Sequence, residues 1–253
     1  MTEKVRLFDI DFDAITKEEA VERLLAWCAS SQVDARYVVT PNVDHVVKLR
    51  SNHAFRAAYR EAAMIVVDGK PVRMASKLLC RPLPETIPGS ELCPLVLERS
   101  RSIGGVSVFL LGAAEGVAER AASVIQSKWP WVKVVGFHSP PMGFAYGTEG
   151  SDAAIALVNA VQPDVLVLGL GAPKQELWVH AAQAQLRVKT ALCVGATIDF
   201  IAGEKARAPK WMQRAGLEWL HRVMSEPRRL ASRYAHDAIV FPLLFIKEVF
   251  NRR

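Results

Sequence analysis

The stretch Tyr37–Asp44, YVVTPNVD, decides the fold when it is read beside Met64–Gly69, MIVVDG. In each, a short run of apolar, mostly β-branched residues stops at small polar groups, Thr40 and Asn42 in the first and Asp68 in the second. Such runs are typical of buried parallel strands, whose carboxyl ends form the ligand-binding edge of an open α/β sheet. A carboxylate at that edge is a candidate general base.

Further strand-like runs recur along the chain, mostly separated by helical patterns. They are Val5–Phe8, Val106–Leu111, Val132–Val135, Val165–Leu168 and Ala191–Val194. This alternation predicts an α/β fold with a mainly parallel, Rossmann-like sheet and helices on both faces. Thr16–Glu19, TKEE, reads as a capping box that begins a helix ending near Ser30.

The composition of the chain becomes basic after Glu204. From residue 205 to the end there are 11 Lys and Arg against 4 Asp and Glu, whereas residues 1–204 carry 21 against 22. We therefore expect an α/β core over residues 1–204 and a basic, amphipathic helical appendage over residues 205–253. A cationic segment of this kind attracts the phosphates of lipid headgroups, nucleic acids or diphosphate substrates.

The cysteines and the N-terminal sequence bear on the compartment. Cys28, Cys80, Cys93 and Cys193 lie far apart without a CxxC pair, so we expect free thiols in a reducing cytoplasm. The opening MTEKVRLFDIDFD lacks the apolar core of a signal peptide, and no stretch approaches the roughly 20 apolar residues of a membrane span. We expect a cytoplasmic protein.

Two glycine-rich turns are candidate anion sites. The turn Gly112–Gly116 resembles half of a nucleotide-binding βαβ turn, but the full GxGxxG fingerprint is absent and close backbone packing explains the glycines better. In Val165–Glu176, VLVLGLGAPKQE, a buried strand leads through Gly171 to a proline at the expected first helical position. Backbone N–H groups of such a turn can hold an anion, with Lys174 and Gln175 reaching the same edge, although a solvated first turn fits equally well.

Other motifs offer less specific chemistry. In GATIDF, Asp199 is placed to accept hydrogen bonds from a ribose or a base, or to cap a helix. Asp9, Asp11 and Asp13 form overlapping DxD patterns, but a hard-cation site needs more oxygen ligands than this local pattern supplies. We expect neither a metal nor a cofactor. The absence of HExxH and GxSxG motifs leaves zinc and serine hydrolases without support.

Taken together, the motifs TPNVDH, PGSEL, GLGAPKQE, GATIDF and RAPKWMQRAGLEWLHR resemble the WecG/TagA/CpsF family of glycosyltransferases from about Phe8 to Phe250. The resemblance implies inverting, metal-independent transfer of a sugar from a UDP-sugar to a saccharide on a polyprenyl diphosphate. It also implies peripheral association with the inner face of the cell membrane and a role in bacterial exopolysaccharide or cell-surface polysaccharide synthesis. The donor sugar is left open among glucose, N-acetylmannosamine and its uronic acid.

Matched residue by residue, the resemblance implies that Asp68 is the general base, with Thr40 and Asn42 beside it around the donor sugar. Gln175 in the PKQE turn would face the reacting groups, and Asp199 would meet the uracil.

The resemblance also supplies the other walls of the site. The loop His138–Gly143, including Pro140 and Gly143, resembles the family's other nucleotide wall. The basic appendage resembles the element that closes the site and rests on the membrane, its expected contributors being Arg207, Arg214, Arg222 and Arg229. Where many relatives have an arginine, this chain has Thr86, and Arg81 is a candidate substitute.

Rival functions remain at this stage. A nucleotide-dependent oxidoreductase would use a similar sheet, but the chain lacks the glycine fingerprint followed by an acidic residue. A non-enzymatic adaptor for membranes or nucleic acid would use the tail alone; the family resemblance implies no nucleic-acid partner. Apolar tail residues such as Trp211 and Trp219 fit either a headgroup boundary or packing on the α/β body, and an apolar face freed by tail detachment would support a homo-oligomer.

Overall fold

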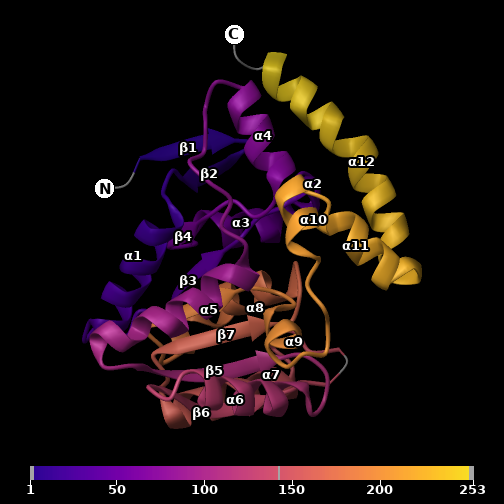
Figure 1. Ribbon diagram of the computed structural model, residues 1–253. Coiled ribbons are helices and arrows are strands. Elements are labelled where there is room, and N and C mark those ends of the chain that lie inside the picture. Colours follow the sequence, from indigo (N-terminus) through magenta and orange to yellow (C-terminus); the bar gives the residue numbers. More distant parts are fainter. Residues whose placement is uncertain (1–2, 142, 251–253) are drawn as a thin grey trace.

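The computed structural model describes residues 3–141 and 143–250, without the side chain of Arg214. At its centre is a six-stranded sheet in the order β4-β3-β8-β7-β5-β6, with every neighbouring pair parallel (Figure 1). The strands are β3 (Arg36–Val39), β4 (Met64–Ile65), β5 (Val106–Gly112), β6 (Val132–His138), β7 (Val165–Gly169) and β8 (Thr190–Cys193). The predicted α/β class with a parallel sheet is confirmed.

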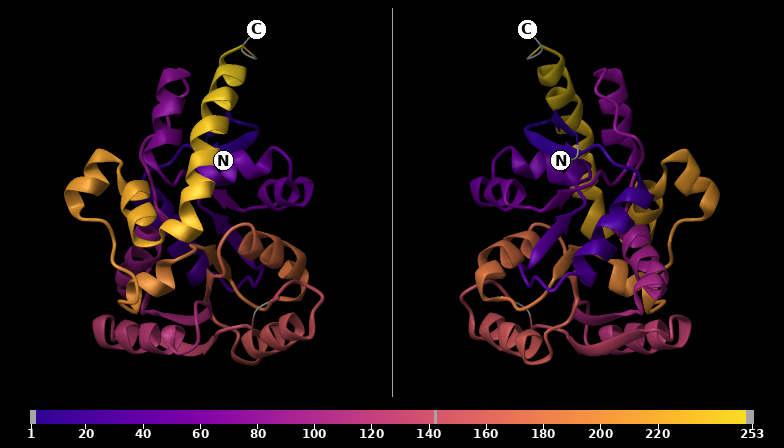
Figure 2. Two further views of the ribbon diagram at one scale, coloured as in Figure 1. Left: turned by 90° about the vertical axis from the view of Figure 1, so that its right-hand side faces the viewer. Right: turned by 90° about the vertical axis from the view of Figure 1, so that its left-hand side faces the viewer.

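Helices cover both faces of the sheet (Figures 1 and 2). On one face, side chains of the sheet form a hydrophobic cluster with α1, α5, α6 and α9. On the other face, they form a second cluster with α2, α3, α7 and α8. The helices of the body are α1 (Lys17–Ala29), α2 (Val43–Leu49), α3 (His53–Arg60), α4 (Lys70–Leu78), α5 (Gly89–Arg99), α6 (Val117–Lys128), α7 (Glu149–Val161), α8 (Lys174–Ala182) and α9 (Thr197–Ile201), with short 3₁₀ turns η1 (Ser100–Ile103) and η2 (Gln183–Gln185).

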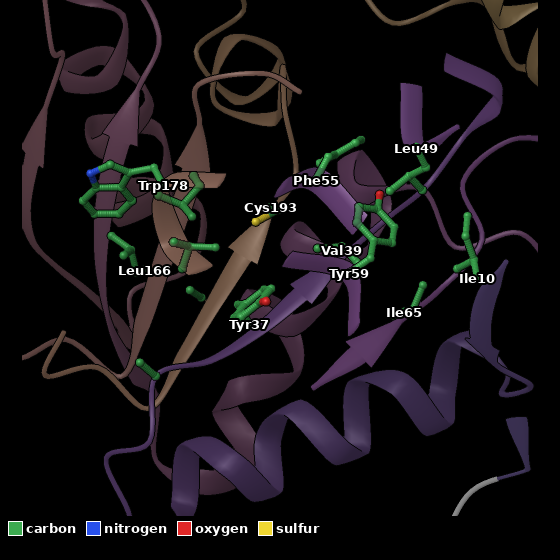
Figure 3. Packing of buried hydrophobic residues seen from close by; sticks show 14 of the residues in the cluster. Ile10, Tyr37, Val39, Leu49, Phe55, Tyr59, Ile65, Leu166, Trp178 and Cys193 are labelled. Atoms are coloured by element: carbon green, nitrogen blue, oxygen red, sulfur yellow. The ribbon is translucent and has the colours of Figure 1, made fainter. Parts of the chain in front are cut away.

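The continuous apolar runs are explained by burial of the sheet on both sides. Along β3, Tyr37 and Val39 join one hydrophobic cluster, whereas Val38 between them joins the other. Successive side chains of a strand point to opposite faces, so a strand covered on both faces has no polar alternation. Figure 3 shows Tyr37 and Val39 packed in the cluster that also holds Trp178.

The first strand-like run lies outside the main sheet. β1 (Lys4–Leu7) pairs antiparallel with β2 (Ile10–Asp13) in a separate two-stranded sheet. The two residues between them, Phe8 and Asp9, both have positive φ, 54° and 59°. Such a two-residue turn reverses the chain at once, so it joins antiparallel strands and cannot feed a parallel sheet.

The acidic residues of this hairpin pair with cations. Asp9 and Asp11 lie within 3.5 Å and 3.3 Å of the guanidinium of Arg6. Asp13 is 3% exposed, pairs with Lys4, and accepts a 2.8 Å hydrogen bond from the backbone N–H of Ile65. The third carboxylate therefore fastens the hairpin to β4.

Two local predictions are confirmed. Thr16 and Glu19 make the reciprocal hydrogen bonds of a capping box at the start of α1, which ends with Ser30 as its C-cap. All four cysteines are free, and three of them, Cys28, Cys93 and Cys193, are buried.

The chain beyond the body is helical: α10 (Lys210–Ala215), α11 (Glu218–Ser225) and α12 (Pro227–Phe250). α12 packs along α2 and α11, and its C-terminal end projects beyond the sheet together with α4 (Figures 1 and 2). Phe241, Leu244 and Phe245 pack against the body's hydrophobic cluster. Over the residues described, no helix combines the length and the apolar character needed to cross a bilayer.

A glycine at the carboxyl edge allows two strands to meet. Gly112 has φ of +126°, and a Cβ placed on it would lie 2.5 Å from the carbonyl carbon of Gly169 on β7. We expect Gly112→Ala to destabilise the protein by about 3 kcal/mol, from overpacking against backbone and from the left-handed conformation. Urea unfolding monitored by circular dichroism measures this loss.

Gly116→Ala is the matched control. It also has positive φ, but its Cβ would meet only the end of the Arg120 side chain, at 3.5 Å, an ordinary van der Waals distance. We expect a loss of about 1 kcal/mol there. If the two variants lose the same free energy of unfolding, crowding against the backbone at Gly112 adds nothing to the cost of the positive φ.

Candidate active site

The loops after β3 and β4 remain hydrogen-bonded to each other beyond the ends of the strands. This brings the predicted residues Asn42 and Asp68 together. The backbone N–H of Val66 donates to Val39 O (3.1 Å), and that of Asp68 donates to Pro41 O (2.9 Å). Asn42 caps α2 by accepting a hydrogen bond from His45 N at 3.3 Å. Since the two loops advance side by side, Asp68 and Asn42 lie at adjacent points of the carboxyl edge.

Thr40 lies deeper in the same edge. It is 5% exposed, and its hydroxyl donates to the carbonyl of Cys193 at the end of β8, at 3.4 Å. The hydroxyl is thus oriented by the neighbouring strand. Gly69, with φ of +101°, starts α4 next to Asn42 and leads the chain away from Asp68.

A cavity of about 280 Å³ lies between this edge and the C-terminal helices. The body contributes Asn42 and Asp68, with the first residues of α4. The C-terminal helices contribute Trp219 and Arg222 from α11 and Tyr234 from α12. The cavity is therefore shared between the body and the segment after Glu204.

Asp68 has the electrostatic character of a base that works near neutral pH. Burial raises the pKa of its carboxyl to about 7, and the charge of Arg222 opposes that rise. Glu218 and Glu91 raise the pKa further, while Arg207 lowers it. A strongly raised pKa in a cavity marks a candidate functional carboxylate.

Gln175 lies beneath the edge. Its Oε1 accepts hydrogen bonds from the backbone N–H groups of Gly171 (3.3 Å) and Gly195 (3.2 Å), and its Nε2 donates to Glu176 Oε1 at 2.8 Å. The side chain is 2% exposed and does not line the Asp68 cavity. It holds the turns after β7 and β8 together. Gln175 was expected to face the reacting groups. In this arrangement it contributes to the edge by holding these two turns in place.

The turn around Gln175 differs in one detail from expectation. α8 begins at Lys174, and Pro173 precedes it as the N-cap residue, joined to Ala172 by a cis peptide bond. Lys174 itself is exposed, and Gly171 has φ of +77° with open space where a side chain would project.

The predicted nucleotide-binding residues lie at the same edge of the sheet but outside the Asp68 cavity. Asp199 is within α9, half-buried, and burial raises its pKa while Lys205 opposes this. Pro140 and Gly143 follow β6, where Ser139 ties the loop to the carbonyl of Ala114 at 3.1 Å. Met142 of this loop falls outside the described residues.

The predicted arginines separate into different environments. Arg222 lines the cavity with Asp68. Arg207 joins Glu91 on α5 (3.1 Å) to Glu218 on α11 (3.4 Å), so it ties the C-terminal helices to the body. Arg229 pairs with Glu226 on the surface. The side chain of Arg214 is outside the described part of the structure.

Arg81 does not take the place expected of an arginine at position 86. Its Nη1 donates to the carbonyl of Arg6 (3.0 Å) and to Glu248 Oε1 (3.3 Å) near the end of α12. It is absent from the lining of the Asp68 cavity.

Sequence reasoning missed a charged group in the cavity wall. Asp44, Arg233 and Asp237 all line it, and each has a buried side-chain atom without a hydrogen-bond partner within the described structure: Oδ1, Nε and Oδ2 respectively. Asp44 belongs to the quoted TPNVDH motif, but nothing in the sequence pairs it with a residue nearly 200 positions later. Only the docking of α12 on α2 joins them.

The sequence matches the family described as "Glycosyl transferase WecG/TagA/CpsF family" over residues 5–253. It is similar to two Staphylococcus aureus proteins named N-acetylglucosaminyldiphosphoundecaprenol N-acetyl-beta-D-mannosaminyltransferase. The protein of strain MRSA252 is 30% identical over 229 residues, covering 90% of this chain and 87% of that protein. The protein of strain MW2 is 29% identical over the same length and with the same coverage.

Asp237 provides a test of the cavity's charge balance. Burial, then the charge of Asp44, raise its pKa against the opposing charge of Arg233. Its ionisation therefore favours the unfolded state at pH values above the ordinary Asp pKa of about 3.9. We expect Asp237→Asn to raise the Tm at pH 7 by about 2 °C, with a smaller gain near pH 4. Differential scanning calorimetry measures both.

Glu98→Gln is the control, since it removes one negative charge from an exposed position on α5. We expect its stability to change by less than about 0.5 kcal/mol. A fall in Tm for Asp237→Asn would mean that attraction to Arg233 outweighs burial and repulsion.

Proposed function

The chain belongs to the WecG/TagA/CpsF family of glycosyl transferases, and from that premise we propose that it transfers a sugar from a UDP-sugar to a saccharide on a polyprenyl diphosphate. The observation that carries the proposal is Asp68, a carboxylate of pKa about 7 in a cavity at the carboxyl edge of the sheet. The names of the relatives make UDP-N-acetylmannosamine and an N-acetylglucosaminyl-diphosphoundecaprenol the first substrate pair to test.

In this proposal Asp68 is the general base. The acceptor hydroxyl attacks the anomeric carbon from the side opposite UDP, so the configuration inverts, and Asp68 removes the hydroxyl proton as the bond forms. A carboxylate of ordinary pKa is a weak base, and the raised pKa brings it close to the working pH. We assign Thr40 and Asn42 to the donor sugar; Asn42 lines the cavity, and Thr40 lies behind the lining with its hydroxyl oriented by the carbonyl of Cys193.

The departing nucleotide needs positive charge. The proposed reaction uses no metal, so backbone N–H groups and arginines stabilise the developing charge on the diphosphate. Arg222 is the arginine we assign to this task, because it lines the Asp68 cavity. Asp199 and the loop with Pro140 and Gly143 receive the nucleotide, and Gln175 keeps the turns between these positions in place.

We further propose that residues 205–253 form an appendage that closes the site and rests on the inner face of the cell membrane. Two features of α12 support this. Its inward residues, including Phe241 and Leu244, pack on the body. Its outward residues Leu243 and Ile246 are 57% and 49% exposed, and the terminal Phe250 is 70% exposed. Such an apolar stripe beside basic residues is suited to the headgroup boundary of a bilayer.

Asp68→Asn tests the base. We expect kcat to fall by about 10²–10⁴ with UDP-sugar binding retained, because the variant keeps the shape of the site but cannot accept the proton. In the wild type, turnover should rise with pH through about 7 as Asp68 ionises, and this rise should vanish in the variant. Asp9→Asn, on the exposed hairpin turn, should leave both unchanged.

The reaction itself is tested by mass spectrometry. The protein is incubated with a panel of UDP-sugars and a synthetic polyprenyl-diphosphate saccharide, and the products are weighed. A single added sugar with release of UDP supports the proposal. Binding of NAD in preference to UDP, or no product from any donor, would favour a different chemistry on the same sheet.

The outward stripe of α12 predicts weakened membrane binding when it is charged. We expect Leu243→Glu/Ile246→Glu to lower sedimentation with anionic vesicles at least tenfold, because two buried apolar contacts are replaced by charges repelled from the lipid. The control Leu157→Glu/Val161→Glu places the same charges on α7, at residues 46% and 40% exposed. Equal losses in both variants would contradict the assignment of α12 as the contact.

A further inference from the structure

A second and larger cavity, of about 570 Å³, lies against the C-terminal half of α12. Its walls come from the β1–β2 hairpin, from α2 and α3, and from Leu244, Lys247 and Glu248 of α12. The Asp68 cavity instead uses α12 from Arg233 to Pro242, with α4 and α11. The two cavities share no lining residue, so the second one has no part in the chemistry proposed above.

The acidic residues around this second cavity are already paired. Asp9 and Asp11 pair with Arg6, and Glu248 pairs with Arg81 at 3.3 Å. Arg6 offsets one of the two hairpin charges and Arg81 offsets that of Glu248, so one negative charge of the three is left to the other cations of the lining.

Within the described part of the chain, three cations of the same lining have no such partner. Among the described residues, no side-chain hydrogen bond or ion pair engages Arg50, Arg60 or Lys247. Another arginine helps to fix the wall that carries them: Arg56 donates from Nη1 to the carbonyls of Leu49 (2.6 Å) and Arg50 (2.7 Å), holding the end of α2. The cavity thus presents unpaired positive charge on a fixed backbone.

Its floor is apolar. Phe8, Leu49 and Leu244 line it, and Phe8 and Leu49 are buried, at 9% and 4% exposed, whereas Arg50 and Arg60 are exposed; the ring of Phe8 packs 5.4 Å from that of Phe241 on α12. An inorganic anion would use the cations and leave this floor uncovered. A molecule with a phosphate and adjoining apolar chains matches both parts.

The geometry of α12 places the cavity beside the proposed bilayer contact. With 100° of rotation per residue, Ile239, Leu243, Ile246 and Phe250 fall on one outward line, opposite the body-facing Leu244 side. Lys247 falls between the two. It is therefore the residue at which the outward stripe meets the rim of the cavity.

We propose that this cavity binds the phosphate of an anionic phospholipid headgroup, through Arg50, Arg60 and Lys247, with the glycerol end of the lipid over the apolar floor. The inference rests on the bilayer contact proposed for α12, but not on the identity of the sugars or on Asp68. Headgroup binding at this position would fix the rotation of the protein on the membrane surface.

The test is vesicle binding by Arg50→Gln/Arg60→Gln, two exposed residues whose replacement spares the core. With phosphatidylcholine vesicles that contain phosphatidylglycerol, we expect a loss of about tenfold to thirtyfold in partitioning. The charge-matched control Lys133→Gln/Arg187→Gln, at exposed positions on β6 and before β8, should change partitioning by less than threefold or so. Equal losses would show only a general charge effect and would overturn the proposal.

A second comparison separates a phosphate site from attraction to any negative surface. Vesicles are matched in surface charge, one set with phosphatidylglycerol and one with oleic acid, whose headgroup is a carboxylate. We expect the wild type to prefer phosphatidylglycerol and the Arg50→Gln/Arg60→Gln variant to lose that preference. No preference in the wild type would overturn the proposal.

The source of the phosphate is tested in solution. A short-chain phosphatidylglycerol below its micelle concentration is compared with glycerol 3-phosphate, by following the arginine side-chain N–H signals in NMR. The lipid should shift the signals of Arg50 and Arg60 at lower concentration than glycerol 3-phosphate does. Equal effects would assign the cavity to a free phosphate compound instead.

Sugar transfer to a water-soluble acceptor keeps this inference distinct from the proposed function. Arg50→Gln/Arg60→Gln should retain wild-type kcat there while losing vesicle binding. Loss of transfer to the soluble acceptor would contradict a lipid site separate from the catalytic cavity. If the wild type transfers no sugar at all but shows the expected lipid preference, the proposed function fails and the lipid site stands.

Discussion

The partial burial of one carboxylate organises this structure. Asp68 lies in the loop that follows the short β4 strand. Burial removes water from its carboxylate and raises its pKa to about 7, because the charge of Arg222 only partly offsets the loss of hydration. The body alone does not make this environment. Trp219 and the other residues of α11 and α12 form the opposite wall of the cavity. The chemistry proposed for Asp68 therefore depends on how the last three helices sit on the sheet.

That placement relies on polar contacts between distant parts of the chain. Arg207 joins Glu91 to Glu218, and Glu91 is also held by Lys17 of α1 at 2.6 Å. The carboxyl edge has its own clamp in Gln175, whose amide joins two turns from neighbouring strands. Both devices use hydrogen bonds to fix loops whose backbone would otherwise move, which is what a preorganised site requires.

α12 meets a different environment on each side. Its inner side packs on α2 and contributes Asp237 to a wall where, among the residues described, several buried polar atoms lack hydrogen-bond partners. Its outer side exposes an apolar stripe, and its flank carries Lys247 into the cationic cavity. A helix with apolar residues on two opposite sides can bury only one of them against a single globular body. The outward side is the reason to look for a lipid surface, while the inward side accounts for its hold on the protein.

The sequence by itself determined the class of fold, the position of most strands, the first helix cap and the family. These follow from local signals: apolar runs, turn residues and short motifs act over a few positions. It predicted that Asp68 and Asn42 follow adjacent parallel strands, and the loops after β3 and β4 carry both to one edge of the sheet. It did not separate the first strand-like run from the main sheet, since the Phe8–Asp9 turn was not recognised in an apolar context.

Tertiary structure alone decided which charged residues meet. The sequence does not rank Arg207, Arg222 and Arg229, yet of these three only Arg222 lines the cavity with Asp68, where it is joined by Arg233. Asp44 and Asp237 come together only through the docking of α12, and Gln175 turns inward to clamp two loops. Long side chains take their partners from whatever packs against them, and packing is a property of the whole chain. Local sequence determines the helices and strands, but contacts between elements distant in the sequence determine which charged residues lie together.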